Sequence, residues 1–235
     1  MLIKNLFSAV AFAALAVGCS QADTQPASDV SDSKSGISYV KGDVVLGNKD
    51  AKVQIIEYAS TSCGHCRTFH KTILPNIKKD FIEQGTVNLI YRDLPTPPAQ
   101  LAAAGAALAR CAGTDEYYKV LDDVFTSQGE IFDAAQSSGG ALPAYVEIGA
   151  RHGMSEADVK ACVTSTPVMD EIMRTADLAS EAGVSSTPTL FINGVKVESK
   201  DMTNDAIKGL LNAALGIETP AESAPATEET AAEAH

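Results

Sequence analysis

The fold of this chain is decided by residues 53–66, which read VQIIEYASTSCGHC. The first half, Val53 to Ala59, is a nearly continuous apolar run, as expected of a strand that is covered on both faces. Two cysteines spaced C-x-x-C follow, and the residues from Cys63 to about Gln84 have the apolar spacing of a helix with one buried face. This pattern predicts an α/β unit in which a thiol lies at the amino terminus of a helix.

Further elements are expected on either side of this unit. Short strands are predicted at 44–46, 87–91, 189–192 and 195–198, the last two joined by the hairpin turn Asn193-Gly194. Helices are predicted throughout 99–164, then at 167–182 and 201–215, and Pro75 should kink the helix that starts at Cys63. The order of elements predicts a small mixed sheet with an inserted all-helical subdomain.

Composition limits the possible functions. The 235 residues suit one domain with an insertion and tails, and a hydrophobic content of 45% is enough for a real core without disulfides. The formal net charge of −12 argues against nucleic acid and anionic membrane surfaces as partners.

The first 18 residues have the pattern of a lipoprotein-type signal peptide. Lys4 is followed by an uncharged, mostly apolar run that is too short to span a membrane. That run ends in Leu15-Ala16-Val17-Gly18-Cys19, which resembles a bacterial lipobox, so Cys19 is expected to carry lipid after cleavage. The alternative is a plain signal peptide with an incidental cysteine.

The remaining chain divides into a folded part between two polar segments. Residues 19–37 are rich in Ser, Asp, Gln and Pro and are interpreted as a disordered tether. Residues 218–235 form an acidic tail without Lys or Arg, either simply solvated or an interaction arm. The domain is expected at 38–217, with the helical insertion at about 98–165.

The number of cysteines suggests export. Five is an odd number for an exported protein, but assigning Cys19 to lipid leaves four, which suits an oxidising compartment. Cys111 and Cys162 lie far apart in the helical segment and are expected to form a structural disulfide. A second redox pair, or two free thiols, are the alternatives.

Cys63-Gly64-His65-Cys66 is the candidate reactive unit. A helix amino terminus favours the thiolate of Cys63, and His65 can donate a further hydrogen bond or positive charge to the same sulfur. Gly64 would allow a partner chain to approach closely. Cys66, one turn further along, should be shielded and resolve a mixed disulfide.

Other interpretations of the cysteine pair remain open. Half of a zinc site would need a second Cys/His pair at ligand spacing, and an inert disulfide in so small a loop would stabilise little. A soft-metal-binding module, or a chaperone with incidental cysteines, belongs to a different class of function. His70 and His152 lack partners at ligand spacing and are interpreted as surface or packing residues, so no metal site is expected.

Two further sequence features have the chemistry that such a pair needs. Glu57 interrupts a strand that should be buried, where it could exchange protons with Cys66; the alternative is an exposed edge residue. Thr187-Pro188 directly precedes a strand, and a cis bond there would turn the Thr187 backbone toward the disulfide and an incoming peptide.

Glu57, the C-G-H-C motif and Thr187-Pro188 before LFING together resemble the DsbA family of thioredoxin-fold proteins, over about residues 42–215. The resemblance implies a periplasmic thiol–disulfide oxidoreductase with Cys63 as nucleophile, Cys66 as resolving thiol, Glu57 as buried acid and Pro188 as cis-proline. The Gly64-His65 pair and Thr187 are instead similar to isomerase and reductase relatives, so the direction of exchange stays open.

The expected partners follow from this reading. They are the thiols and disulfides of exported proteins and a membrane redox protein that recycles the cysteine pair. Neither a cofactor nor nucleic acid is expected. The expected location is the periplasm or cell envelope, with membrane contact only through a lipid on Cys19.

Overall fold

The computed structural model describes residues 37–217. The predicted signal peptide, Cys19, the tether up to residue 36 and the acidic tail at 218–235 lie outside the described residues. Their interpretation therefore stays a prediction.

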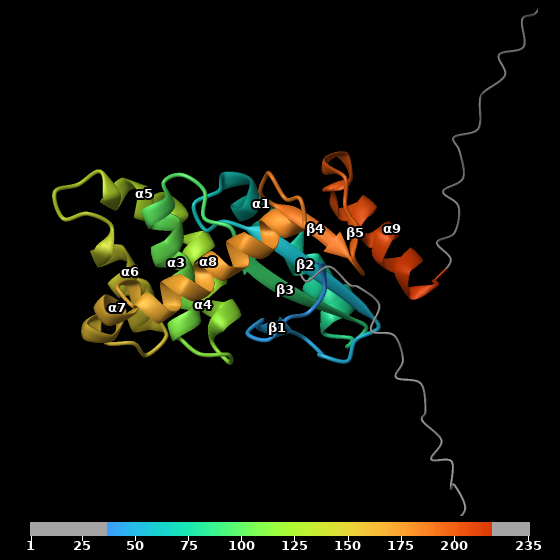
Figure 1. Ribbon diagram of the computed structural model, residues 1–235, viewed down its shortest axis with the longest axis horizontal. Coiled ribbons are helices and arrows are strands. Elements are labelled where there is room, and N and C mark those ends of the chain that lie inside the picture. The colour runs from blue at the N-terminus through green and yellow to red at the C-terminus, as the bar shows by residue number, and fades with distance from the viewer. Residues whose placement is uncertain (1–36, 218–235) are drawn as a thin grey trace, which may run out of the picture. The chain divides into compact units, whose positions relative to one another are not determined.

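A five-stranded mixed sheet is the centre of the domain, with strand order β1-β3-β2-β4-β5 (Figure 1). Only β2 and β3 pair in parallel, and the other neighbours are antiparallel. Strand β2 is central because its apolar residues are buried on both faces, as its sequence predicted. The strands are β1 (Val45–Leu46), β2 (Val53–Ala59), β3 (Val87–Asp93), β4 (Thr189–Ile192) and β5 (Val195–Lys196).

Helices cover the sheet and form a separate block beside it. The helices α3 to α7 follow β3 and gather at one end of the sheet, α8 leads back from them, and α9 lies toward the opposite end (Figure 1). The thioredoxin-like fold with an inserted helical segment is therefore confirmed. The helices are α1 (Gly64–Thr72), α2 (Leu74–Ile77), α3 (Ala99–Cys111), α4 (Tyr117–Thr126), α5 (Gln128–Ala135), α6 (Leu142–Arg151), α7 (Glu156–Val163), α8 (Thr166–Glu181) and α9 (Asn204–Leu215), with a π-helical turn at Lys78–Ile82 and a 3-10 turn at Ser199–Asp201.

The sheet and the helical insertion share one hydrophobic core. Its largest cluster contains Val53 and Leu89 from the strands together with Phe125 and Ile148 from the insertion, and each is at most 1% exposed. The insertion is thus packed onto the sheet rather than attached by a linker, which lets it contact the end of β2 from which the cysteines follow.

The helical segment predicted from Cys63 to about Gln84 is divided near Pro75. Helix α1 ends at Thr72, Ile73 keeps a right-handed helical backbone, and Pro75 lies in the first turn of the short helix α2. Proline has no N–H to continue the hydrogen-bond ladder, and its ring clashes with the preceding turn, which accounts for the break at this place. A π-helical turn at Lys78–Ile82 completes the segment.

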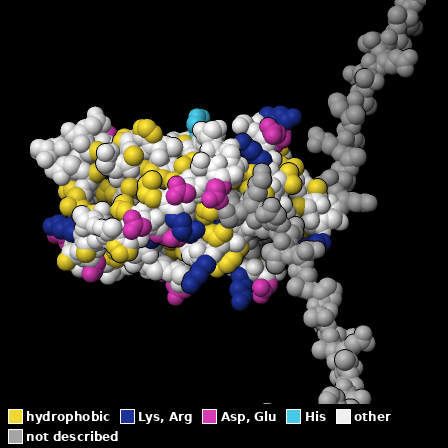
Figure 2. Space-filling model, viewed as in Figure 1, with side chains coloured by type: hydrophobic (Ala, Val, Ile, Leu, Met, Phe, Trp, Pro, Cys, Tyr) yellow, Lys and Arg dark blue, Asp and Glu magenta, His cyan; other side chains and the backbone are white. Residues whose placement is uncertain are grey.

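Charged side chains are dispersed over the surface. Figure 2 shows Lys and Arg interspersed with Asp and Glu on the face that it presents, with no gathered basic area. Within residues 37–217, no helix is long and apolar enough to cross a membrane.

Candidate active site

Cys63 caps the amino terminus of α1. Its sulfur accepts a hydrogen bond from the backbone N–H of Cys66 at 3.4 Å and lies 3.5 Å from the carbonyl oxygen of Thr187, to which the protonated thiol can donate. The pKa of Cys63 is lowered to about 5, chiefly by the hydrogen bond from the side chain of Cys66, although partial burial acts against this. Backbone N–H groups of the helix end add to the lowering. At neutral pH, Cys63 is therefore a thiolate at the protein surface.

Cys66 has the opposite character. Its side chain is fully buried, and both cysteines are free thiols in the structure. Burial raises the pKa of Cys66 far above its ordinary value, and the hydrogen bond to Cys63 and the negative charge of Glu57 raise it further. The pair thus combines an accessible thiolate with a shielded thiol.

Glu57 lies in the middle of β2 with no exposed surface. Its neighbours in the sheet are Tyr91 on β3 and Leu190 on β4, so the alternative of an exposed edge residue is excluded. Its Oε2 atom lies 3.1 Å from Nε2 of His70, while Oε1 has no hydrogen-bond partner among the described residues. A buried carboxylate with one free oxygen is suited to accepting or donating a proton.

His70 is the residue of this site that the sequence reading missed. It was interpreted as a surface or packing residue without a partner, but its side chain is only 1% exposed and contacts Glu57. The sequence did hold a signal: His70 follows Cys66 by four residues, which places both on one face of a helix. A histidine on the same helix face as Cys66, next to a buried glutamate, is a candidate for a role in the chemistry of the site.

The far side of the His70 ring faces the helical insertion. Its Nδ1 atom lies 3.5 Å from Oδ1 of Asp122, and its ring stacks on Phe125 with centroids 4.0 Å apart. Burial alone would lower the pKa of His70, but the charges and hydrogen bonds of Glu57 and Asp122 outweigh it and raise that pKa. Both residues of the insertion that contact the ring, Asp122 and Phe125, belong to α4.

The Thr187–Pro188 peptide bond is cis, and it places the Thr187 backbone beside Cys63. Strand β4 begins at the next residue and pairs with β2 through Thr189 and Tyr58. The structure therefore brings a loop 124 residues distant in sequence to the reactive sulfur.

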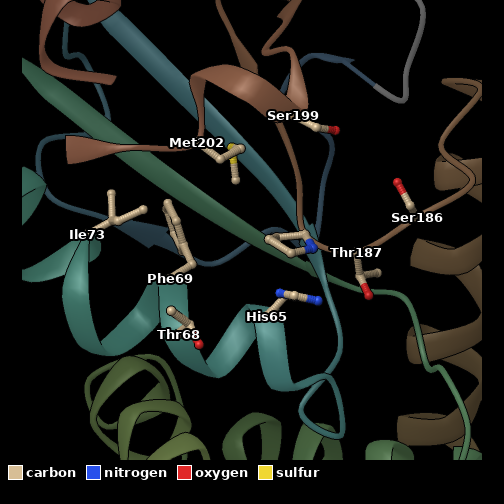
Figure 3. A pocket seen from close by; sticks show the side chains of 9 residues that line it. His65, Thr68, Phe69, Ile73, Ser186, Thr187, Ser199 and Met202 are labelled. Atoms are coloured by element: carbon tan, nitrogen blue, oxygen red, sulfur yellow. The ribbon is translucent and has the colours of Figure 1, made fainter. Parts of the chain in front are cut away.

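A groove of about 430 Å³ opens beside the cysteines. Figure 3 shows His65 and Thr187 near each other, with Phe69 and Met202 contributing apolar walls. Its complete lining is His65, Thr68, Phe69, Ile73, Ser186, Thr187, Pro188, Ser199 and Met202. Thr187 therefore belongs both to the groove and, through its carbonyl oxygen, to the surroundings of the Cys63 sulfur.

Comparison with known proteins agrees with this arrangement. The family model described as "Thioredoxin" matches residues 39–213. The chain belongs to the thioredoxin family. A Rickettsia bellii relative named provisionally as a protein-disulfide oxidoreductase is 28% identical over 68% of this chain, and "Disulfide bond formation protein D" of Bacillus subtilis is 23% identical over 69%. The matches span 60% of the length of the Rickettsia protein and 72% of the Bacillus protein.

Two solved structures show the same fold. Wolbachia pipientis alpha-DsbA1 superposes with a TM-score of 0.70 at 24% identity, covering 78% of this chain and 96% of that one. Oxidised BdbD from Bacillus subtilis gives 0.67 at 23% identity, covering 79% and 99%. The resemblance to DsbA-like proteins is thereby confirmed at the level of the fold.

The helical insertion also contributes contacts around the site. Gln128 at the start of α5 donates from Nε2 to the carbonyl oxygens of Thr61 at 2.8 Å and Cys63 at 3.2 Å. Thr61 Oγ1 in turn donates to the carbonyl of Ala102 in α3 at 2.9 Å. Sequence reasoning missed these residues too, because nothing local links Gln128 to a loop 67 residues earlier.

Cys111 and Cys162 are apart from this site. They form a disulfide between α3 and α7, with Cα atoms 6.2 Å apart. Within the described part of the chain, no group of three or more His, Cys, Asp or Glu side chains is arranged to hold a metal ion.

Proposed function

We propose that this chain is an exported thiol–disulfide oxidoreductase that exchanges disulfides with protein substrates, acting as a DsbA-like dithiol oxidase. The observation that carries the proposal is the contrast within the C-x-x-C pair. An accessible Cys63 whose pKa is about 5 adjoins a buried Cys66 whose pKa is raised, at the edge of a peptide-sized groove.

The proposed reaction starts from the Cys63–Cys66 disulfide. A substrate thiolate attacks the sulfur of Cys63, the bond to Cys66 breaks, and Cys66 takes up one proton. The substrate's second thiol loses its proton and attacks the mixed disulfide at the substrate sulfur, which releases Cys63 as a thiolate. Two electrons pass from the substrate to the protein. Of the two protons of the substrate dithiol, one ends on Cys66, and the other goes to solvent when the attacking thiolate forms.

The surrounding residues have distinct proposed roles. Thr187 and Pro188 dock the substrate backbone, since the loop lies between the reactive sulfur and the groove. His65 lines the same groove and would contact the bound peptide near the Cys63 sulfur. Glu57 exchanges the proton of Cys66, because its charge already acts on that thiol and one of its oxygens is free of hydrogen-bond partners among the described residues.

The pKa of Cys63 supports the oxidising direction. A stabilised thiolate favours the reduced protein and makes Cys63 a good leaving group, both of which drive oxidation of the substrate. The value of about 5 lies between those of about 3.5 for a strongly oxidising and about 7 for a reducing relative in the superfamily. The alternative of a reductase or isomerase rests on Gly64-His65 and Thr187.

The deciding experiment compares oxidative refolding of a reduced substrate with reduction of insulin, using Cys63→Ser as the control. The oxidase proposal expects refolding activity that the variant lacks, and a Cys63/Cys66 potential nearer to about −120 mV than to about −270 mV. A potential at the lower value with strong insulin reduction would instead establish a reductase. Equal behaviour of wild type and variant in both assays would refute the enzyme proposal.

A soft-metal site is less well supported by the same geometry. Metal ions of this kind bind thiolates, but burial holds Cys66 in its neutral form. The pair therefore offers one thiolate rather than two. Copper(I) titration of the reduced protein would favour the soft-metal site over disulfide exchange if it showed tight binding through both cysteines.

We also propose export with a lipid on Cys19, cleavage after residue 18, a tether at 19–37 and a solvated acidic tail after the domain at 38–217. The protein would act at the cell envelope on thiols of exported proteins and would be reoxidised by a membrane redox partner. Mass spectrometry of the mature protein and its Cys19→Ser variant tests the lipid: an unmodified amino terminus in the wild type would exclude it.

A further inference from the structure

We propose that His70 and Asp122 form a proton route that connects the buried Glu57 beside Cys66 with solvent. The inference rests on the proposed function and extends it from the cysteine pair to the helical insertion. Protons must cross this region in every cycle, because Cys66 is fully buried yet alternates between a thiol and a disulfide partner.

The first link of the route is inside the core. Glu57 and His70 are both excluded from solvent, with side chains 0% and 1% exposed, and their Oε2 and Nε2 atoms lie 3.1 Å apart. The charge of Glu57 raises the pKa of Cys66, and Oε1 of Glu57 is buried without a hydrogen-bond partner among the described residues, which leaves it free to accept a proton. Among the described residues, His70 is the only titratable or charged side chain that forms a hydrogen bond or ion pair with Glu57. A proton taken from Cys66 by Glu57 therefore has His70 as its next acceptor.

The second link reaches the surface. Nδ1 of His70 lies 3.5 Å from Oδ1 of Asp122, whose side chain is 41% exposed. Nδ1 has no hydrogen-bond partner among the described residues, so proton transfer over this link requires the two side chains to move closer together. The other Asp122 oxygen pairs with Nζ of Lys78 at 2.5 Å, which holds the carboxylate in place. An imidazole can accept a proton on one nitrogen while releasing one from the other, so this ring joins a buried carboxylate to a solvated one.

The ring is held in the orientation that the route needs. It stacks on Phe125 of α4 at 4.0 Å and contacts the edge of Tyr91 of β3 at 5.9 Å, both between centroids. The titratable and charged groups around it are Glu57 from β2, Cys66 from its own helix, Tyr91 from β3, Asp122 from α4 and, through Asp122, Lys78. Burial raises the pKa of Tyr91 well above its ordinary value, so Tyr91 stays neutral and does not compete.

Protons move outward along the route when Cys66 attacks a mixed disulfide on Cys63. Cys66 passes its proton to Glu57, Glu57 passes one to Nε2 of His70, and Nδ1 releases one toward Asp122 and solvent. The Cys66 sulfur then bonds to Cys63 and the substrate leaves as a thiolate. In the reverse direction the same atoms deliver a proton to the departing Cys66.

The test uses the full chain and measures the attack of Cys66 on a mixed disulfide separately from the reaction of Cys63. Reduced protein is mixed with a slight excess of dithiobis(nitrobenzoate): Cys63 releases the first thionitrobenzoate, and attack by Cys66 releases the second. Stopped-flow absorbance resolves the two phases across a pH series. We expect His70→Gln to slow the second phase about tenfold near neutral pH and Asp122→Asn to slow it about threefold, with the first phase unchanged. In the pH profile of the second-phase rate, His70→Gln should also remove the inflection that arises from titration of His70.

The chain supplies a matched control. His152 also lies between two carboxylates, with Nδ1 3.1 Å from Glu116 and Nε2 2.9 Å from Asp123, but on the insertion away from the cysteines. His152→Gln should leave both phases unchanged.

The outcomes separate the two proposals. Loss of both phases in the wild type would refute the proposed exchange activity. A normal first phase with an unchanged second phase in His70→Gln would refute the proton route, even if that variant melted at a lower temperature. If His70→Gln does not fold, Asp122→Asn decides, because its half-exposed side chain can be changed without opening the core. An unchanged second phase and pH profile in Asp122→Asn would overturn the route.

Discussion

Two residues of the same type, three positions apart, have opposite properties in this protein. Cys63 receives hydrogen bonds at a helix end and has a pKa of about 5, whereas burial and the charge of Glu57 keep Cys66 protonated. The difference arises from the environment of each sulfur and not from the motif, since both cysteines belong to the same C-x-x-C. In the proposed mechanism, this asymmetry allows Cys63 to react with substrates while Cys66 stays protonated.

We predict that alkylation of reduced protein by iodoacetamide titrates with the Cys63 thiolate. The rate should be constant above about pH 6 and fall as the pH drops through about 5, because the folded pKa is depressed and protonation then removes the nucleophile. By linkage, the reduced form should lose stability relative to the oxidised form as the pH falls from about 8.5, the ordinary pKa of cysteine, to about 5, with no further loss below that. Mass spectrometry of quenched samples measures the rate, with Cys63→Ser as the control. An inflection near about 8.5 would contradict the prediction.

At the scale of elements, α3 holds the loop that presents Cys63. Gly105 makes this possible, because a Cβ there would lie 2.6 Å from Oγ1 of Thr61 and 2.9 Å from Cγ1 of Val124. Thr61 is also tied to α3 by its hydrogen bond to Ala102. The position of the reactive loop therefore depends on a close contact with a helix of the insertion.

We predict that Gly105→Ala destabilises the protein by about 1–3 kcal/mol through overpacking, and slows disulfide exchange because Thr61 must shift. The matched control is Gly209→Ala in α9, where nothing lies within 4 Å of the added carbon. That change should stabilise by about 0.5–1 kcal/mol, since alanine favours a helix interior over glycine. Urea unfolding and the exchange assay measure both effects. Equal stability of the two variants would show that α3 can move away at little cost.

At the scale of the whole molecule, the insertion and the sheet behave as one packed body. They share the main core, and the Cys111–Cys162 disulfide closes the insertion across a sequence separation of 51 residues. A crosslink of that length limits the unfolded chain, which is the usual source of disulfide stabilisation in the loop-entropy account. The insertion is thus stabilised independently of the reactive pair.

We predict that replacing both Cys111 and Cys162 by Ala lowers the free energy of unfolding by about 2–4 kcal/mol. The comparison is made in a Cys63→Ser, Cys66→Ser background, so that added reductant acts on the structural disulfide alone. Reductant should destabilise that background protein and leave the Ala variant unaffected. An unchanged unfolding midpoint in the Ala variant would argue against a structural bridge.

Local features of the sequence were enough to predict the strand β2, the C-x-x-C at a helix start, the hairpin at Asn193-Gly194 and the mixed sheet with its helical insertion. Each depends on residues that are neighbours in the chain, where apolar period and turn residues determine the backbone. Pro75 also predicted a disturbance of the helix that follows Cys63, and the structure has it as a one-residue break at Ile73.

The sequence alone was enough to predict the candidate reactive thiols, Cys63 and Cys66, and a buried glutamate, Glu57, on the strand before them. The partners of these groups became visible only in the fold. His70 acquires its partners from β2 and α4, and Gln128 reaches back to Thr61 and Cys63. The physical reason is that these contacts join segments tens of residues apart, so they depend on which face of each insertion helix packs against the sheet. Periodicity shows that a helix has a buried face, but not what that face will meet.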